Sequence, residues 1–537
     1  MKTAWATALL LVAGAASFAP GCGSNEATTP PVHDAGTIPS DGGTLASDGG
    51  LQADTTALLD PAACGLCHAN HYKDWSGSMH AYASQDPVFL AMNKRMQREN
   101  PSLGTFCVKC HAPMAVIAGK TTDGLNLSTL SAGYLGVTCY FCHTIASVDA
   151  AHPFNAGVTL SGDRVMRGEY AKTVPNSVHD AVYSPYQDQS KPESASMCGA
   201  CHDIVSPANG HIERTFAEWQ ASPFSGETDA SQGVTTCAAS GCHMVAQPTM
   251  KPIVTIPAPD GGTFPDRINT DHDFPAVDQA LTSFPNTAAE QTNVTSKLTN
   301  ALQGALCVTQ GSGRIGVILD TVALGHDFPS GAAQDRRLWT EVIARDSSGN
   351  VIYQSGVVPD GMSPTDVGAS DPDIWLLRDC MFDAQGDVVD MFWQGASIDG
   401  NELPPIQAFF PSPLAYASHK VRFFPKNGGF LTNDAGAPQI PASVTLRVRL
   451  QPIGLDVLND LASTGDLDPK VVASLPPPVD IPLGEGSPTT LTWTADAAAD
   501  GGVMSFNDNG HLATCVGSLS IPSPSPAVAH MNPKCSP

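Results

Sequence analysis

Apolar residues recur at different spacings in the two halves of this 537-residue chain. In the first half, Val88, Met92 and Met96 fall at helical intervals, and the pattern predicts helices over residues 67–83 and 86–99. Long stretches between such segments show no clear periodicity. We therefore expect a first half that is mainly helical and rich in loops.

After about residue 285 the pattern changes. One amphipathic helix is expected over 287–305, and beyond it apolar and polar residues alternate as they do in strands. The predicted strands are 314–319, 338–345, 351–353 and 444–450. The turn sequence Asp-Ser-Ser-Gly-Asn at 346–350 joins the second and third strands into a hairpin. Many short strands separated by Gly and Pro predict a β-sandwich, so the fold class is multidomain α+β.

A short motif, C-x-x-C-H, occurs four times in the first half, and a fifth copy has four residues between its cysteines. This motif is the attachment signature of c-type haem, in which two thiols bind the porphyrin and the histidine binds the iron. A trailing His in each copy argues against zinc knuckles. The motif cysteines are Cys64, Cys67, Cys107, Cys110, Cys139, Cys142, Cys198, Cys201, Cys237 and Cys242, and the motif histidines are His68, His111, His143, His202 and His243.

The fifth copy spans residues 237–243, and its Ala-Ala-Ser-Gly insertion is small and flexible enough to bulge. The alternative for this copy is a disulfide between Cys237 and Cys242. We expect five haems c, the fifth on this widened motif.

The second axial position decides what each iron does, because a second His closes the iron for electron transfer and an open position allows substrate chemistry. Five histidines outside the motifs are candidate ligands: His80, His152, His179, His272 and His326. His211 is the main competitor of His152. His272 and His326 share the sequence His-Asp-Phe-Pro, in which a rigid Pro would help to fix the imidazole.

The N-terminus has a short charged head followed by an apolar core, which is typical of a secretory signal. Cys22 follows in a sequence that resembles a lipoprotein cleavage site, so a lipid anchor through Cys22 is expected, with plain secretion as the alternative. The predicted divisions are a signal peptide (1–21), a flexible tether (22–57), a multihaem domain (58–286), a β-sandwich domain (287–480) and a C-terminal extension (481–537).

The net charge of −25 makes nucleic acid and anionic membrane surfaces poor partners, whereas a basic redox protein fits. Of the 15 cysteines, ten belong to the motifs and Cys22 to the expected anchor. The remaining four, Cys307, Cys380, Cys515 and Cys535, predict two disulfides in an oxidising compartment. Their pairing stays open, with Cys515 to Cys535 as the most local choice.

Residues 59–250 resemble the multihaem cytochrome c superfamily that includes tetrahaem electron carriers and hydroxylamine oxidoreductases. The matching residues are Cys64 to His68 with Tyr72, Trp75, Ser78 and His80, and Cys198 to His202 with Thr215, Glu218, Trp219 and Ser222. The region around Gly325–Gly331 with Trp339 resembles the β-domain appended to many such exported cytochromes. The resemblance implies bis-His haems in close contact, with His80, His272 and His326 as ligands.

We therefore expect an exported cytochrome that passes electrons between a redox donor and an acceptor, in the periplasm or as a surface lipoprotein of a Gram-negative bacterium. The alternative is a reductase or oxidoreductase that acts on a small nitrogen or sulfur compound at an open haem. Against this alternative, no motif ends in Lys, as the catalytic motif of pentahaem nitrite reductases does. A third interpretation is a surface binding protein in which the β-domain dominates.

Overall fold

The computed structural model describes residues 55–174, 176, 178–226, 233–258, 262–308, 313–322, 324–406, 420–426, 431–433, 435–484 and 488–495, together with the backbone of Ala46–Ser47. They belong to one compact unit, residues 41–537. The expected signal peptide, Cys22, Cys515 and Cys535 lie outside the described residues, as does most of the expected tether.

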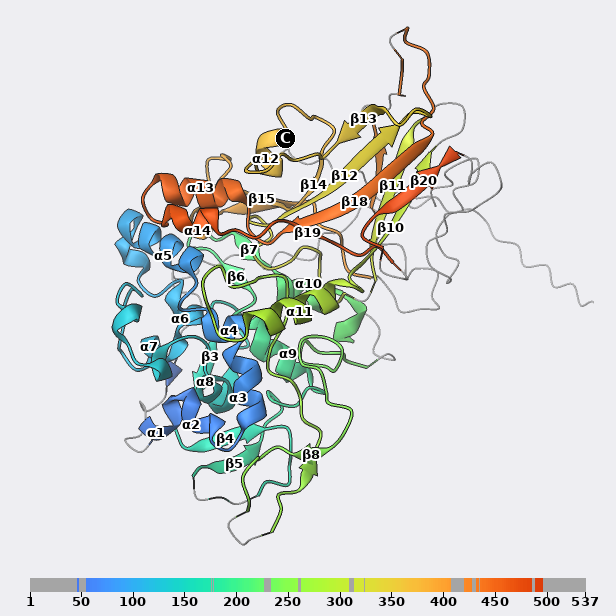
Figure 1. The fold of residues 1–537 in the computed structure, drawn as a ribbon. Helices are drawn as coiled ribbons and strands as arrows, with labels where there is room; N and C mark the ends of the chain where they lie inside the picture. The colour runs from blue at the N-terminus through green and yellow to red at the C-terminus, as the bar shows by residue number, and fades with distance from the viewer. Residues whose placement is uncertain are drawn as a thin grey trace, which may run out of the picture. The chain divides into compact units, whose positions relative to one another are not determined.

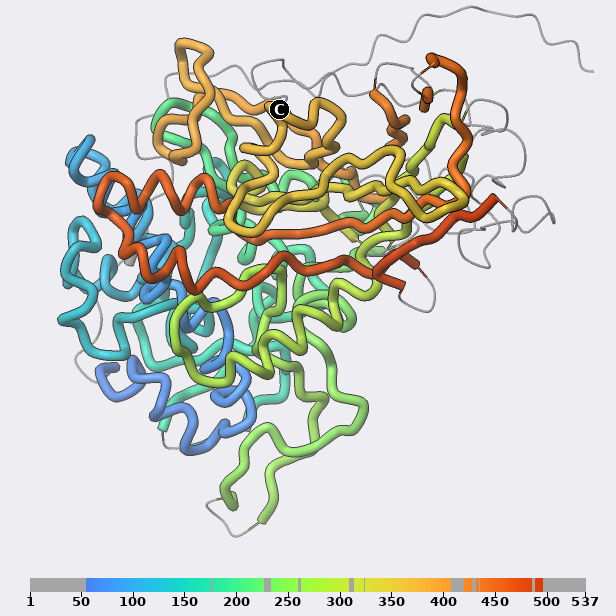
Figure 2. The backbone as a smooth tube through the Cα atoms, turned by 45° about the horizontal axis from the view of Figure 1, so that its top comes forward, coloured from blue at the N-terminus to red at the C-terminus, as the bar shows by residue number. Residues whose placement is uncertain are grey.

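Short helices joined by long connections build the first half (Figures 1 and 2). Side chains fix where they begin: in α5, Asp86 accepts hydrogen bonds from the backbone N–H groups of Val88 and Phe89, and Pro87 takes the first helical position, where no N–H is needed. The helices of this half are α1 (Thr56–Leu59), α2 (Pro61–Gly65), α3 (Ala69–Ser76), α4 (Met79–Tyr82), α5 (Pro87–Glu99), α6 (Val108–His111), α7 (Pro113–Ile117), α8 (Cys139–Thr144), α9 (Pro192–Gly199), α10 (Thr215–Ala221) and α11 (Thr287–Leu298).

Helix α5 confirms the helix predicted over 86–99, and Val88, Met92 and Met96 lie on its buried face. The helix predicted over 67–83 is broken into α3 and α4. Ser78 causes the break, because its backbone is extended and its side chain caps α4 by accepting a hydrogen bond from the N–H of Ala81.

A three-stranded sheet (β1-β3-β2), three strand pairs (β4-β5, β6-β7 and β8-β9) and single 3₁₀ turns connect these helices. The strands are β1 (Ala46–Ser47), β2 (Ile145–Val148), β3 (Val158–Leu160), β4 (Val165–Gly168), β5 (Asp180–Tyr183), β6 (Ile204–Val205), β7 (His211–Glu213), β8 (Lys251–Pro252) and β9 (Asp266–Arg267). The 3₁₀ turns along the chain include η1 (Pro101–Leu103), η2 (Leu127–Thr129), η3 (Ala132–Tyr134), η4 (Pro223–Ser225) and η6 (Phe392–Gln394).

Two sheets build the second half (Figure 1). One has the order β10-β11-β17, and the other has the order β13-β12-β18-β19, with β14 on β12 and β20 on β18. Their strands are β10 (Leu302–Val308), β11 (Ile315–Thr321), β12 (Arg337–Arg345), β13 (Val351–Ser355), β14 (Trp375–Leu377), β17 (Lys420–Phe424), β18 (Ser443–Gln451), β19 (Val479–Asp480) and β20 (Leu491–Thr494). A separate pair is β15 (Asp379–Phe382) with β16 (Ser397–Gly400), and the helices are α12 (Pro364–Val367), α13 (Leu455–Ser463) and α14 (Pro469–Ala473).

The two sheets share one apolar core, which gives the β-sandwich predicted from the alternating pattern. In β18, Val444, Leu446 and Val448 point inward and meet Leu306 of β10 and Val317 of β11 in the same cluster. The β12–β13 hairpin turns at 346–350 as expected.

Two segments differ from expectation. The helix predicted over 287–305 ends at Leu298, because residues from Leu302 onward form β10, which is buried on every position and pairs with β11. Strand β20 pairs with β18, so the sheet continues past residue 480 into the expected extension.

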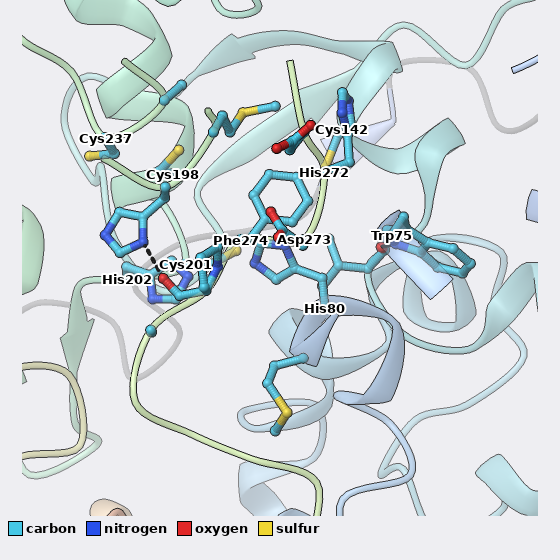
Figure 3. Close-up of a pocket in the computed structure, with 18 of the residues that line it drawn as sticks. Trp75, His80, Cys142, Cys198, Cys201, His202, Cys237, His272, Asp273 and Phe274 are labelled. Atoms are coloured by element: carbon cyan, nitrogen blue, oxygen red, sulfur yellow. Dashed lines mark hydrogen bonds between the residues drawn. The ribbon is translucent and has the colours of Figure 1, made fainter. Parts of the chain in front are cut away.

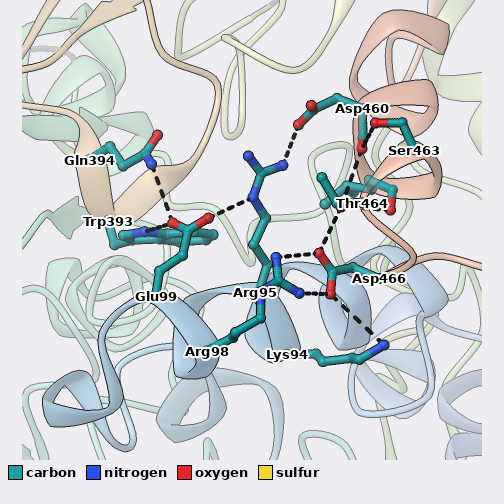
Figure 4. A network of polar contacts seen from close by, with 11 residues as sticks. Lys94, Arg95, Arg98, Glu99, Trp393, Gln394, Asp460, Ser463, Thr464 and Asp466 are labelled. Carbon is teal, nitrogen blue, oxygen red and sulfur yellow. Dashed lines mark hydrogen bonds and ion pairs between the residues drawn. The ribbon is translucent and has the colours of Figure 1, made fainter.

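Helix α13 of the second half packs against α5 of the first, and charged side chains line their contact (Figure 4). Arg95 pairs with Asp460, and Arg98 makes two bonds to Asp466. Trp393 donates its indole N–H to Glu99 at 3.1 Å. An apolar cluster beneath these contacts joins residues of both halves.

None of the described helices is long and apolar enough to cross a membrane. Cys307 and Cys380 are disulfide-bonded, whereas the ten motif cysteines are free thiols. The pairing among Cys307, Cys380, Cys515 and Cys535 stays a prediction, since the last two lie outside the described residues.

Candidate functional site

Each motif forms one turn that gathers its two thiols and its imidazole. The backbone N–H of His68 donates to the carbonyl of Cys64 at 2.8 Å, and His202 donates to Cys198 at 3.0 Å. Residues three and four apart share a face in such a turn, so both sulfurs and the histidine point to the same side.

The widened fifth motif closes the same way. The N–H of His243 donates to the carbonyl of Cys237 at 3.1 Å, although two more residues separate them than in the other copies. Gly241 absorbs the extra length with φ +97°, a conformation that other residues rarely adopt. Cys237 and Cys242 are both free thiols, so the structure does not contain the alternative disulfide.

All ten motif cysteines and all five motif histidines line one continuous cavity of about 1600 Å³. Figure 3 shows part of it, where His80, His202 and His272 point inward beside Cys142, Cys198 and Cys201. A cavity of this size, lined by paired thiols and imidazoles, matches the donor set that haem c requires.

Thiols of different motifs lie close enough to shift one another's pKa, and these neighbours give the order of the motifs along the cavity. The pairs are Cys64 with Cys139, Cys110 with Cys201, and Cys198 with Cys237. Cys142 of the third motif also lies close enough to Cys198 of the fourth to raise its own pKa. The first motif therefore adjoins the third, the third adjoins the fourth, and the fourth also adjoins the second and the fifth.

Four histidines from outside the motifs face four motif histidines. The ring-centroid distances and interplanar angles are 6.4 Å and 29° for His68 with His179, 6.4 Å and 17° for His143 with His272, 6.2 Å and 50° for His202 with His80, and 6.2 Å and 19° for His243 with His326. Two imidazoles that held one metal ion between them, with metal–nitrogen distances of about 2 Å, would have their ring centroids about 6 Å apart. All four pairs have this spacing.

In five of these eight rings, and in His111, a hydrogen bond at Nδ1 leaves Nε2 available to bind metal. The Nδ1 atoms lie at donor distance from backbone carbonyls: His143 from Arg167 (2.6 Å), His243 from Pro275 (2.9 Å), His272 from Thr270 (2.9 Å), His326 from Asp327 (2.8 Å), His179 from Asp180 (3.0 Å) and His111 from Ala83 (3.0 Å). An Nδ1–H that donates in this way fixes the tautomer that metal-binding histidines use.

Burial keeps most of these imidazoles neutral, as a metal ligand must be. It lowers the pKa of His80 and His272 to about 3 and that of His243 to about 4, with neighbouring histidines adding to the effect. His202 differs. Burial alone would lower its pKa, but the carboxylate of Glu213, 3.5 Å from Nδ1, raises it to about 9.

The second motif lacks a facing histidine among the described residues. Its His111 ring stacks flat on Phe89, with centroids 4.1 Å apart and planes 4° apart. That distance is too short to hold a metal between the two rings. Phe89 therefore packs against one face of the imidazole and holds the orientation of the ring.

The structure does not bring His152 to any motif. Its side chain is 41% exposed, and Nδ1 lies 3.2 Å from Asp149 in the loop after β2. The competitor His211 pairs with Asp203 at the surface. Neither residue lines the cavity, because His152 lies in an exposed loop and His211 begins strand β7 with its side chain 42% exposed.

Sequence reasoning did not identify Glu213 or the role of Phe274, and it placed His71 too close to its own motif to face that haem, although within possible reach of a neighbouring one. Glu213 orients His202. The ring of Phe274 lies between those of His80 and His272, with centroid distances of 4.6 Å and 5.7 Å, and the backbone of Phe274 has a φ of +45°. His71 stands edge-on to His272 at 4.6 Å, and its buried Nδ1 has no hydrogen-bond partner among the described residues. The Phe of the repeated His-Asp-Phe-Pro sequence was the available signal for Phe274.

Comparison with known proteins agrees with this geometry. A family model described as cytochrome c554 and c-prime matches residues 63–144, which include the first three motifs. A solved penta-heme cytochrome c552 from Thermochromatium tepidum shares the fold with a TM-score of 0.51 and 18% identity, over 81% of this chain and 98% of that chain. No curated protein matches the chain.

Proposed function

We propose that this chain, whose motifs and fold are those of multihaem cytochromes c, is an exported electron-transfer protein that carries five haems and passes electrons between a redox donor and an acceptor. Haem c, when bound, supplies the one-electron chemistry. The protein supplies the thiols that attach each group, the imidazoles that close the iron and the apolar walls that exclude water.

The observation that carries this proposal is the set of four facing imidazole pairs, all at 6.2 to 6.4 Å. Two axial histidines leave no position for a substrate, which favours electron transfer over catalysis at these sites. The contacts between motifs support transfer within the protein, because every motif adjoins at least one other. The fourth motif adjoins three, so it is the junction of the array.

The second motif favours a second candidate function. His111 faces no other histidine in the described part of the chain, and apolar side chains, including Val88, Met92 and Phe106, line the cavity with it. A histidine-ligated iron with an open position in an apolar pocket can bind a small ligand. This is the site at which a reductase or oxidoreductase activity on a small nitrogen or sulfur compound would reside.

One set of measurements tests both candidates. Mass spectrometry of the purified exported protein is expected to give the polypeptide plus five haems. Electron paramagnetic resonance of the oxidised protein should show four low-spin haems and one high-spin haem, and the reduced protein should bind one CO per chain. A fully low-spin protein that binds no CO would reject the second candidate, and a colourless protein would reject both.

The cysteines of the chain support an oxidising compartment, and its net charge supports a basic redox partner. The predicted signal peptide, the motif thiols and the disulfide-bonded Cys307 and Cys380 support export to an oxidising compartment, with lipidation of Cys22 as the proposed anchor. A net charge of −25 favours a basic redox partner over nucleic acid. Metabolic labelling with a radioactive fatty acid, compared between the native chain and Cys22→Ser, tests the anchor.

A further inference from the structure

The histidine that faces the fifth motif comes from the second half of the chain, on a loop that α10 of the first half holds. This loop spans residues 326–331. Glu218 accepts hydrogen bonds through Oε2 from the backbone N–H of Asp327 at 3.1 Å and from the hydroxyl of Ser330 at 2.6 Å. Thr215, one turn earlier on α10, accepts from the N–H of Gly331 at 3.1 Å. Thr215 and Glu218 lie three residues apart and therefore share one face of the helix.

The peptide units of Asp327 connect Glu218 to the imidazole. The N–H of Asp327 donates to Glu218, and the carbonyl of the same residue accepts from Nδ1 of His326 at 2.8 Å. A shift of Asp327 would therefore rotate or displace the imidazole of His326. The ring now lies 6.2 Å from His243, with 19° between the planes.

Other contacts hold the Glu218 carboxylate itself in place. Its side chain is 10% exposed, and Arg214 lies 3.8 Å from the second oxygen. Arg214 in turn bonds Asp379 and Glu402 of the second half, each at 3.0 Å. The carboxylate is thus fixed on one side by the guanidinium and on the other by the loop that carries His326.

We propose that Glu218, assisted by Thr215, is a positioning residue for His326 and sets the orientation in which this imidazole faces His243. The proposal rests on the proposed function, in which these two histidines close the iron at the fifth motif. An imidazole that leaves this position would leave that iron with an open sixth position.

The test compares three variants of the full-length, haem-loaded protein: His326→Ala, Glu218→Ala and Glu218→Gln. The readouts are the high-spin population in electron paramagnetic resonance and CO uptake by the reduced protein, with haem content checked by mass. His326→Ala is expected to gain one high-spin, CO-binding haem per chain. Glu218→Ala is expected to gain a fraction of the same signal with unchanged haem content, and Glu218→Gln to restore the native spectrum, because an amide oxygen can accept both hydrogen bonds.

The variants distinguish the positioning role of Glu218 from the pairing of His326 with His243. If His326→Ala changes the spectrum and Glu218→Ala does not, the positioning role of Glu218 is overturned while the ligand pair stands. If His326→Ala leaves the spectrum unchanged, the ligand pair and the proposal built on it both fail. Should Glu218→Ala not fold, Thr215→Val gives the same comparison by removing the two hydrogen bonds of Thr215 to Gly331 and Ser330, and a native spectrum in that variant counts against the proposal.

Discussion

The ring of His272 lies 6.4 Å from that of His143, with 17° between the two planes. Their Nδ1 atoms lie at donor distance from the carbonyls of Thr270 and Arg167, so the Nε2 atoms remain available to bind a metal. Residues far apart in the chain thus meet as a preformed pair, and single substitutions can test the pair directly.

Replacing His272 with Ala should open one iron. We expect His272→Ala to gain one high-spin, CO-binding haem per chain, because the imidazole opposite His143 is lost. His152→Ala is the matched control: it removes an exposed imidazole outside the cavity and should leave spin state and CO uptake unchanged. A His152→Ala protein with the altered spectrum would contradict the placement of both residues.

Glu213 should lower the reduction potential at the fourth motif. Its carboxylate lies 3.5 Å from Nδ1 of His202 and favours the more positive, oxidised iron. We expect Glu213→Gln to raise the potential of that haem, with a loss of about 1 kcal/mol corresponding to roughly 40 mV for one electron. Spectroelectrochemical titration measures it, and an unchanged set of potentials would show that the contact only orients the ring.

Gly241 should be needed for attachment at the fifth motif. Its φ of +97° disfavours any side chain, although a methyl group on its Cα would meet no atom within 4 Å. Gly241→Ala should cost about 1–2 kcal/mol of local strain and lower the fraction of chains with a fifth haem, as measured by mass. Gly361→Ala is the control, since Gly361 has φ +79° and equally open surroundings outside the cavity. Equal haem loss in both variants would make the effect one of general stability.

The contact between the two halves should weaken as pH rises. Burial, together with a hydrogen bond to Glu402, raises the pKa of Asp379 to about 10, far above its value of about 3.9 in an unfolded chain. The native state therefore binds more protons than the unfolded state between these values, and stability falls as pH increases. We expect the free energy of unfolding to fall by up to roughly 1 kcal/mol per pH unit from this group between pH 6 and 9.

Asp379→Asn separates this effect from other titrations. The amide keeps an acceptor for Arg214 but cannot ionise, so the variant should show a flatter dependence of unfolding free energy on pH than the native protein. Urea titrations at several pH values measure both slopes. Parallel slopes would mean that Asp379 is already ionised throughout the range.

The sequence predicts the contacts within each motif and the strongly periodic helices and strands. It does not predict which residues from distant parts of the chain meet. The thiol pairs follow from spacing, because one backbone turn brings Cys64, Cys67 and His68 together. Helix α5 and strand β18 follow from strong periodicity. The helix expected over 287–305 ends early because pairing with β11 outweighs the local pattern after Leu298.

Facing histidines depend on how distant segments fold together. Position in the chain made both His152 and His179 candidates, with His152 the least certain, and only His179 is carried to a motif, by the segment that leads into β5. Nothing in the sequence distinguishes Glu213 from other acidic residues. Only the folding of β7 places its carboxylate beside His202. Sequence could also not reveal that His111 would have Phe89 as its neighbour.

The origin of His326 in the second half also bears on how the finished protein is made. Every thiol that anchors a cofactor precedes residue 244, so all attachment chemistry can be complete while the sandwich is still unfolded. Under the proposed function, the fifth motif would gain its second histidine, His326, only when the loop at 326–331 docks against α10. If the proposed function holds, the spectrum of the fifth haem would report whether the second half has folded onto the first, because a chain stopped at residue 286 lacks His326.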